Sequence, residues 1–166
     1  MIGCMRTARI PALIGAAAIL LAGCGTAVER GADGFRHEHG TEARHAAAAI
    51  GRLTAAVGAL GANPSAAQLE SVALEQHRAR RQLLAAVSWT QLENGEEEGV
   101  SQAEREIHEA AGALLAAMTE IRRYTQSRSP AALAAYRRQF AAGREYWNQG
   151  ISQLWHIAKV SGAPTI

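Results

Sequence analysis

Apolar residues recur every three or four positions in four stretches of the chain, which is the spacing of an amphipathic helix. These stretches cover about residues 41–60, 63–92, 101–126 and 130–160. Glycine, asparagine, proline and serine residues separate them, and these residue types commonly start or end helices. The pattern therefore predicts four helices joined by short connections.

Three of the predicted helix starts carry capping residues. Residues 101–104 read Ser-Gln-Ala-Glu, the capping-box pattern in which the serine and the glutamate bond each other's free backbone amides. Ser129 precedes Pro130, so a cap is followed by a proline suited to the first turn. The helix over 63–92 is expected to be capped by either Asn63 or Ser65, with the intervening proline in its first turn.

Four helices of this length favour an all-α fold, an antiparallel up-down-up-down four-helix bundle over residues 41–160 with a short tail over 161–166. The composition agrees, because apolar residues make up 48% of the chain but aromatic residues only 5%, and much of the apolar fraction is alanine. Two stacked helical hairpins with an open groove are the alternative arrangement.

Two glycines interrupt the apolar face of the helix over 130–160. Gly143 and Gly150 lie seven residues apart, where the core is expected to be thickest. Two interpretations are open. Either each glycine makes room for a neighbouring ring, such as that of Tyr124 or Trp89, or the two glycines leave a pocket beside Trp147. Close packing is the more common use of such positions.

The segment before the first predicted helix has a different composition. Residues 25–40 read GTAVERGADGFRHEHG, with several glycines, mixed charge and no apolar period. This composition predicts a flexible tether over residues 24–40, with a mean reach of roughly 20 to 25 Å.

The first 23 residues have the features of a targeting segment. Arg6 and Arg9 precede an apolar run over residues 10–22, which is shorter than the roughly 20 apolar residues that cross a bilayer. The run ends in Leu21-Ala22-Gly23-Cys24, which resembles the lipobox of bacterial lipoproteins. The alternative is an ordinary secretory leader with an incidental cysteine.

The resemblance implies a signal peptide over residues 1–23, cleaved before Cys24. In that family a diacylglycerol group is attached to the cysteine sulfur, and further acylation, for example by palmitate, often follows on the new amine. Two or three acyl chains give stable membrane attachment. The resemblance thus implies a chain anchored through Cys24 at the extracytoplasmic face of a bacterial membrane.

Charge and motif content exclude several classes of function. Removing Arg6 and Arg9 from the 17 basic residues leaves 15, which match the 15 acidic residues, so no basic excess points to nucleic acid. No serine-nucleophile motif, phosphate-binding glycine loop or suitably placed carboxylate pair is present. We therefore expect a non-catalytic chain without a cofactor.

Arginines cluster on either side of the predicted turn near residue 128. In an antiparallel bundle they lie at the end opposite the tether, while the acidic run 96–98 lies at the tether end. These arginines are the predicted docking surface for a protein or an anionic envelope partner, with a merely solvated surface as the alternative. They are Arg122, Arg123, Arg128, Arg137, Arg138 and Arg144.

Histidines suggest a second class of function, a ligand-binding bundle that holds a metal, haem or a small apolar molecule. His37 and His39 are weak metal candidates because two imidazoles on a mobile segment can converge on one ion. His77 and His108 are the histidines whose helical phase places them near the core. Buried histidines or a pocket beside Trp147 would distinguish this class from a surface-binding module.

Overall fold

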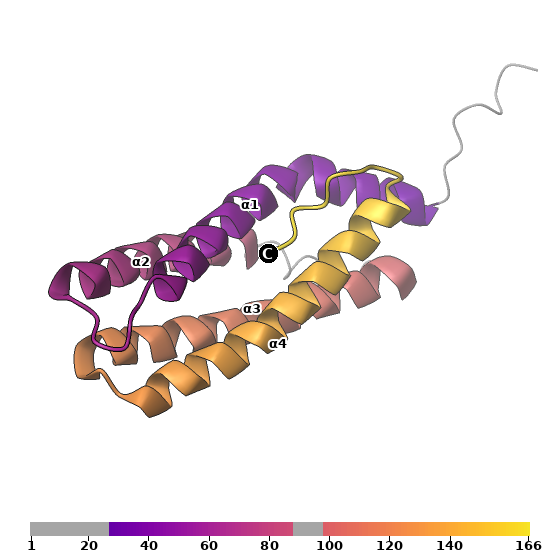
Figure 1. Cartoon of the computed structure of the whole chain (residues 1–166). Helices are drawn as coiled ribbons and strands as arrows, with labels where there is room; N and C mark the ends of the chain where they lie inside the picture. Colours follow the sequence, from indigo (N-terminus) through magenta and orange to yellow (C-terminus); the bar gives the residue numbers. More distant parts are fainter. Residues whose placement is uncertain (1–26, 88–97) are drawn as a thin grey trace, which may run out of the picture.

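The structure, a computed structural model, describes residues 27–87 and 98–166, and these residues form an all-helical fold without strands. Four helices are present in these ranges: α1 (Ala27–Gly58), α2 (Ala66–Val87), α3 (Glu98–Ser127) and α4 (Pro130–Ile157) (Figure 1). The all-α prediction is confirmed. No helix within these ranges is long and apolar enough to cross a membrane.

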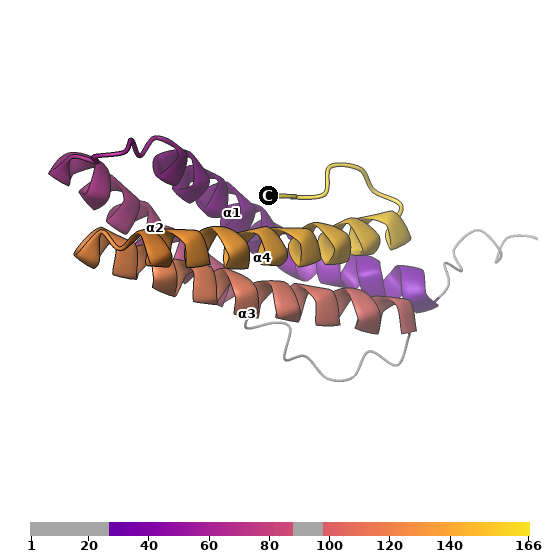
Figure 2. The same cartoon turned by 60° about the horizontal axis from the view of Figure 1, so that its bottom comes forward.

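The helices pack as two hairpins. α1 pairs with α2, and α3 pairs with α4 through the most extensive interface of the molecule. Contacts of α2 with α3 and of α1 with α4 join the hairpins (Figures 1 and 2). The α1–α2 connection and the α3–α4 turn lie at one end, and α1 begins at the other end, near the end of α4.

Local capping determines where α2 and α4 begin. The Ser65 amide donates to Gln68 Oε1 at 2.9 Å, and the Gln68 amide donates to Ser65 Oγ at 3.2 Å. Ser65 is therefore the cap of α2, and the proline before it precedes the helix instead of lying in its first turn. Ser129 caps α4 as predicted, because its hydroxyl accepts from the Ala132 amide and Pro130 opens the helix.

The start of α3 differs from the prediction. α3 begins at Glu98, so Ser101 lies inside the helix and is not its cap. A serine in the first turn and a serine at the cap look alike in sequence.

The predicted flexible tether is wrong for residues 27–40, which belong to α1. Ala32 is fully buried, and a Cβ on Gly40 would lie 3.7 Å from the ring of Trp155. Asp33 also forms an ion pair with Arg36 at 2.7 Å, one helical turn away. Small residues on this half of α1 let the helix pack against the body of the molecule, and this packing outweighs the low helix propensity of glycine.

The predicted apolar stripes form the core. Leu84 is the exception, since it is 44% exposed. Trp155 is only 2% exposed because it packs against the first half of α1. The buried stripe residues include Ala46, Ile50, Leu53, Leu69, Val72, Leu83, Ile107, Ala111, Leu114, Met118, Ile121, Tyr136, Trp147 and Leu154.

Gly143 and Gly150 serve close packing of α4 against α3. A Cβ on Gly143 would lie 2.7 Å from Leu114 Cγ and 3.0 Å from the Leu114 nitrogen. A Cβ on Gly150 would lie 2.7 Å from the carbonyl oxygen of Ala103 and 2.8 Å from Ile107 Cγ1. The neighbours are thus backbone and aliphatic side chains of α3, not the ring of Tyr124, and Trp89 lies outside the described residues.

The chain after α4 folds back along that helix (Figure 1). The indole N–H of Trp147 donates to the Pro164 carbonyl at 2.8 Å. The Asn148 side chain exchanges two hydrogen bonds with the backbone of Ile166, at 2.8 and 3.0 Å. The tail over 161–166 is therefore held by side chains of α4.

Candidate functional site

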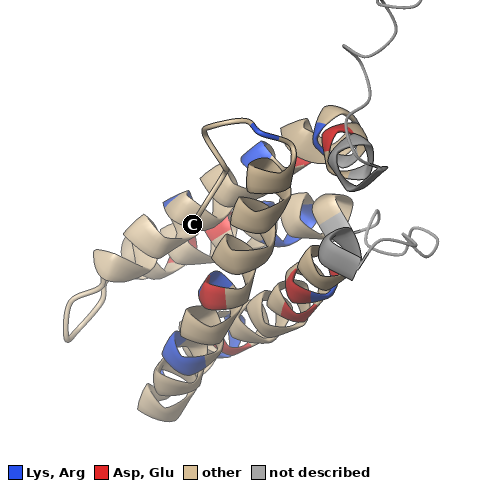
Figure 3. Ribbon diagram, turned by 90° about the vertical axis from the view of Figure 1, so that its right-hand side faces the viewer, with Lys and Arg blue, Asp and Glu red and all other residues tan. Residues whose placement is uncertain are grey.

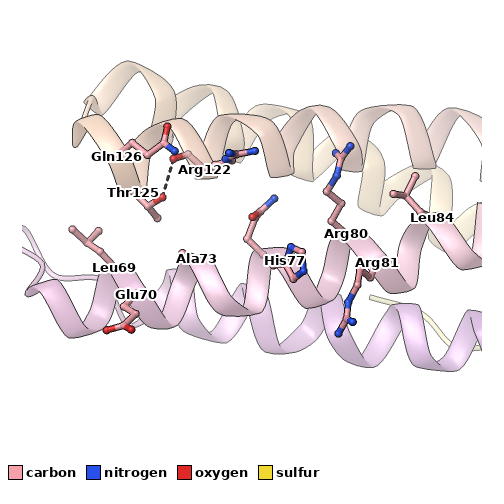
Figure 4. A pocket seen from close by; sticks show the side chains of 11 residues that line it. Leu69, Glu70, Ala73, His77, Arg80, Arg81, Leu84, Arg122, Thr125 and Gln126 are labelled. Carbon is pink, nitrogen blue, oxygen red and sulfur yellow. Dashed lines mark hydrogen bonds between the residues drawn. The ribbon is translucent and has the colours of Figure 1, made fainter.

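An open groove of about 770 Å³ lies between α2 and α3 (Figure 4). α2 supplies most of its lining, and α3 supplies the opposite edge near its C-terminal end. The groove is lined by Leu69, Glu70, Ala73, Gln76, His77, Arg80, Arg81, Leu84, Arg122, Thr125 and Gln126.

The polar middle of α2 explains why this interface stays open. Residues 75–82 are nearly all polar, and among them His77 and Arg80 line the groove and are exposed, while Gln76 also lines it but is only 7% exposed. Long polar side chains that remain hydrated do not fill the space between two helices as leucines do. α2 and α3 therefore contact each other less extensively than α3 and α4 do.

Three arginines give the groove its charge. Arg80 extends from α2 toward α3, and Arg122 lies along α3 on the facing edge, with Arg81 next to Arg80 on α2 (Figure 4). Within the described parts of the chain, no carboxylate forms an ion pair with any of the three. Glu70 is the one acidic residue of the lining. The groove is therefore a positively charged surface.

Other arginines nearby are neutralised. Glu75 binds Arg78 at 2.7 Å and Arg52 at 3.3 Å, which ties α2 to α1 on the side away from the groove. Glu120 binds Arg123 at 3.2 Å on α3. The absence of such pairs at Arg80, Arg81 and Arg122 distinguishes the groove from these surfaces.

The six arginines predicted from the sequence are all exposed, but they have different surroundings. Arg122 lies in the groove, and Arg123 is engaged by Glu120. Arg128 has a positive φ of 55° and its amide donates to the Tyr124 carbonyl at 2.7 Å, so it reverses the chain after α3. Arg137, Arg138 and Arg144 lie on the surface of α4.

Sequence reasoning missed Arg80 and Arg81. The signal was present, because the polar run in the middle of α2 interrupts an otherwise apolar pattern.

Figure 3 shows that acidic and basic residues are interspersed on the helices at the end where α1 begins. The acidic residues 96 and 97 that were expected at this end lie outside the described residues.

The histidine candidates do not form a metal site. His37 and His39 lie on α1, where a two-residue step separates side chains by about 200°, so they cannot converge as they would on a mobile segment. Among the residues that the structure describes, no three His, Cys, Asp or Glu side chains are placed to hold an ion. His77 lines the groove, and His108 is exposed.

Two titratable groups have shifted pKa values. Burial raises the pKa of the Glu104 carboxyl. Burial also raises the pKa of the Tyr136 phenol to about 12, an effect that the nearby Thr54 hydroxyl partly offsets. Thr54 donates its own proton to the Ile50 carbonyl at 2.9 Å. The Tyr136 hydroxyl is buried and makes no hydrogen bond among the described residues.

The lipobox Leu21-Ala22-Gly23 and the lipidation residue Cys24 lie outside the described residues. Comparison of the chain with protein-family models, with curated proteins and with solved structures found no match.

Proposed function

We propose that the chain is a lipid-anchored lipoprotein of the bacterial cell envelope whose helical part is a non-catalytic binding module. The lipobox over residues 21–24 supports the anchor and the extracytoplasmic location. The binding role rests on one observation: Arg80, Arg81 and Arg122 line an open groove and have no carboxylate partner among the described residues.

The proposal includes the finer topology, an antiparallel up-down-up-down four-helix bundle. α1 contacts α2 and α4, and α3 contacts α2 and α4, which is the neighbour relation of such a bundle. In this arrangement the groove is one corner of the bundle, left open by the polar middle of α2.

The chemistry of the groove suits an acidic partner. Guanidinium groups bind carboxylates or phosphates with two parallel hydrogen bonds and keep their charge at every physiological pH. Binding through exposed charges weakens as salt screens them, so the proposed interaction should be salt-dependent. Arg137, Arg138 and Arg144 would extend the positive surface around the α3–α4 turn.

The anchor is tested by replacing Cys24 with alanine in cells fed a labelled fatty acid. The wild-type chain should carry the label and be cut before residue 24, because the sulfur is the attachment point. The Cys24→Ala chain should carry no label and keep its leader. Normal processing of this variant would remove the lipoprotein assignment.

Binding is tested by cross-linking the wild-type chain in intact envelopes and recovering its partners at low and at high salt. A double variant, Arg80→Glu with Arg122→Glu, should lose them. Arg44→Glu with Arg105→Glu is the matched control, since it makes the same charge change at exposed residues outside the groove. Equal loss in both variants would argue against a binding site in the groove.

A further inference from the structure

The groove lining follows the spacing of a helix-docking seam. Ala73, His77, Arg80 and Leu84 all line the groove, are exposed, and follow one another at steps of four, three and four residues. This is one face of α2, displaced from the face that buries Val72, Ala79 and Leu83 in the core. α2 thus carries a second stripe that no helix among the described residues covers.

The two ends of this stripe, Ala73 and Leu84, are apolar, and its middle carries the cationic Arg80. Leu84 is 44% exposed, although leucine normally avoids water, and it lies one turn after Arg80. A partner helix without an acidic residue opposite Arg80 would leave an unpaired guanidinium in the interface, which is unfavourable. The stripe therefore favours partners that carry an acidic residue at that position. Arg122 on the facing edge adds a second cation at the same groove.

The size of the groove favours a helix. The 11-residue separation of Ala73 and Leu84 corresponds to about 16 Å along α2, which is about three turns of a second helix. A helix lying between α2 and α3 would contact both edges, as in other helix-in-groove complexes. A small anion could pair with one arginine but would leave Leu84 exposed.

We infer that the groove binds an amphipathic helix of a partner protein, with apolar residues for Ala73 and Leu84 and a glutamate or aspartate for Arg80 and Arg122. This inference deepens the proposed function and depends on it. It adds the class of partner and the order of contacts along α2: apolar, acidic, apolar.

The experiment measures binding of synthetic peptides to the full chain in neutral detergent by calorimetry. The first peptide has 18 residues, with leucines at helical spacing around two glutamates on the same face. Its controls are a scrambled peptide of the same composition, a peptide with glutamine in place of glutamate, and polyglutamate. Vesicles containing anionic phospholipid form a separate arm.

The designed peptide should bind, and the glutamine peptide should bind at least tenfold more weakly. The variant Arg80→Glu with Arg122→Glu should also lose at least tenfold, and a peptide with lysines in place of the glutamates should recover binding to it. Leu84→Ala should weaken binding a few-fold. The control Arg44→Glu with Arg105→Glu should bind like the wild type.

Equal binding of the scrambled peptide or of polyglutamate would overturn the inference, since the groove would then bind any polyanion. Binding of none of the peptides, or groove-dependent binding of the vesicles alone, would also overturn it. The proposed function is decided separately, by lipid labelling of Cys24 and by groove-dependent capture in envelopes. If partners are still captured in envelopes but none of the peptides binds, the inference of a helical partner is wrong and the proposed binding role of the groove stands.

Discussion

The two interfaces of α3 show how differently one helix can be packed on its two sides. Against α4, glycines at 143 and 150 bring α3 so close that a single added Cβ would overlap its atoms. Against α2, long polar side chains leave an open groove of about 770 Å³. The closed interface stabilises the fold, and the open interface leaves arginines available to a partner.

The largest expected effect concerns the closed side. Trp147 is fully buried between the two glycine contacts and its indole holds the Pro164 carbonyl, so Trp147→Ala should lower the free energy of unfolding by about 3 to 5 kcal/mol. Leu84→Ala at the groove should lower it by less than about 1 kcal/mol, since this side chain is already 44% exposed. Urea denaturation followed by circular dichroism measures both. Similar losses of unfolding free energy in the two variants would contradict the difference in packing between the α3–α4 interface and the groove.

A smaller effect is expected from single methyl groups. Gly150→Ala should destabilise the chain by about 1 to 3 kcal/mol, because its Cβ would lie 2.7 Å from a backbone oxygen that cannot move alone. Gly112→Ala is the matched control: it lies in α3 with no atom within 4 Å, so the gain in helix propensity should stabilise the chain by up to about 1 kcal/mol. The two substitutions should shift the melting temperature in opposite directions. A stabilising Gly150→Ala would show that the interface is not closely packed.

The smallest effect concerns pH at the contact of α4 with α1. Burial raises the pKa of Tyr136 from 10.0 to about 12, so the folded state holds the phenol proton more tightly than the unfolded state. The resulting stabilisation is nearly complete at pH 9 and is lost as the pH rises through 10 toward 12, with about 1.4 kcal/mol lost at pH 11. Urea midpoints measured from pH 9 to pH 11.5 should fall in the wild type. In Tyr136→Phe the part of this fall that comes from ionisation of the phenol should be missing. An identical pH profile of the urea midpoint in the variant would show that Tyr136 does not cause the fall.

The sequence predicted the core better than the boundaries of the helices. Stripe positions such as Ile50, Leu114 and Leu154 are buried because helical periodicity depends on local geometry alone. The helix over 27–40 was not predicted, because its stability comes from a contact between Gly40 and Trp155, residues more than 100 positions apart. Local composition cannot reveal such a contact.

The candidate site was predicted only in part. The sequence singled out Arg122 but grouped it with Arg123, which Glu120 neutralises one turn away. Arg80 and Arg81 were missed because pairing of arginines on different helices depends on which faces of α2 and α3 meet. The open groove lies on the α2–α3 side, where polar residues of α2 replace apolar ones.

Because α1 begins at Ala27, the proposed anchor limits how far the start of the helical fold can stand from the bilayer. With lipid on Cys24, only three residues precede Ala27, and they span at most about 10 Å. α1 has 32 residues and is about 48 Å long. The proposed anchor would therefore hold the first turn of α1 beside the lipid headgroups, and an upright α1 would carry its far end, where α2 begins, roughly 50 Å away from them.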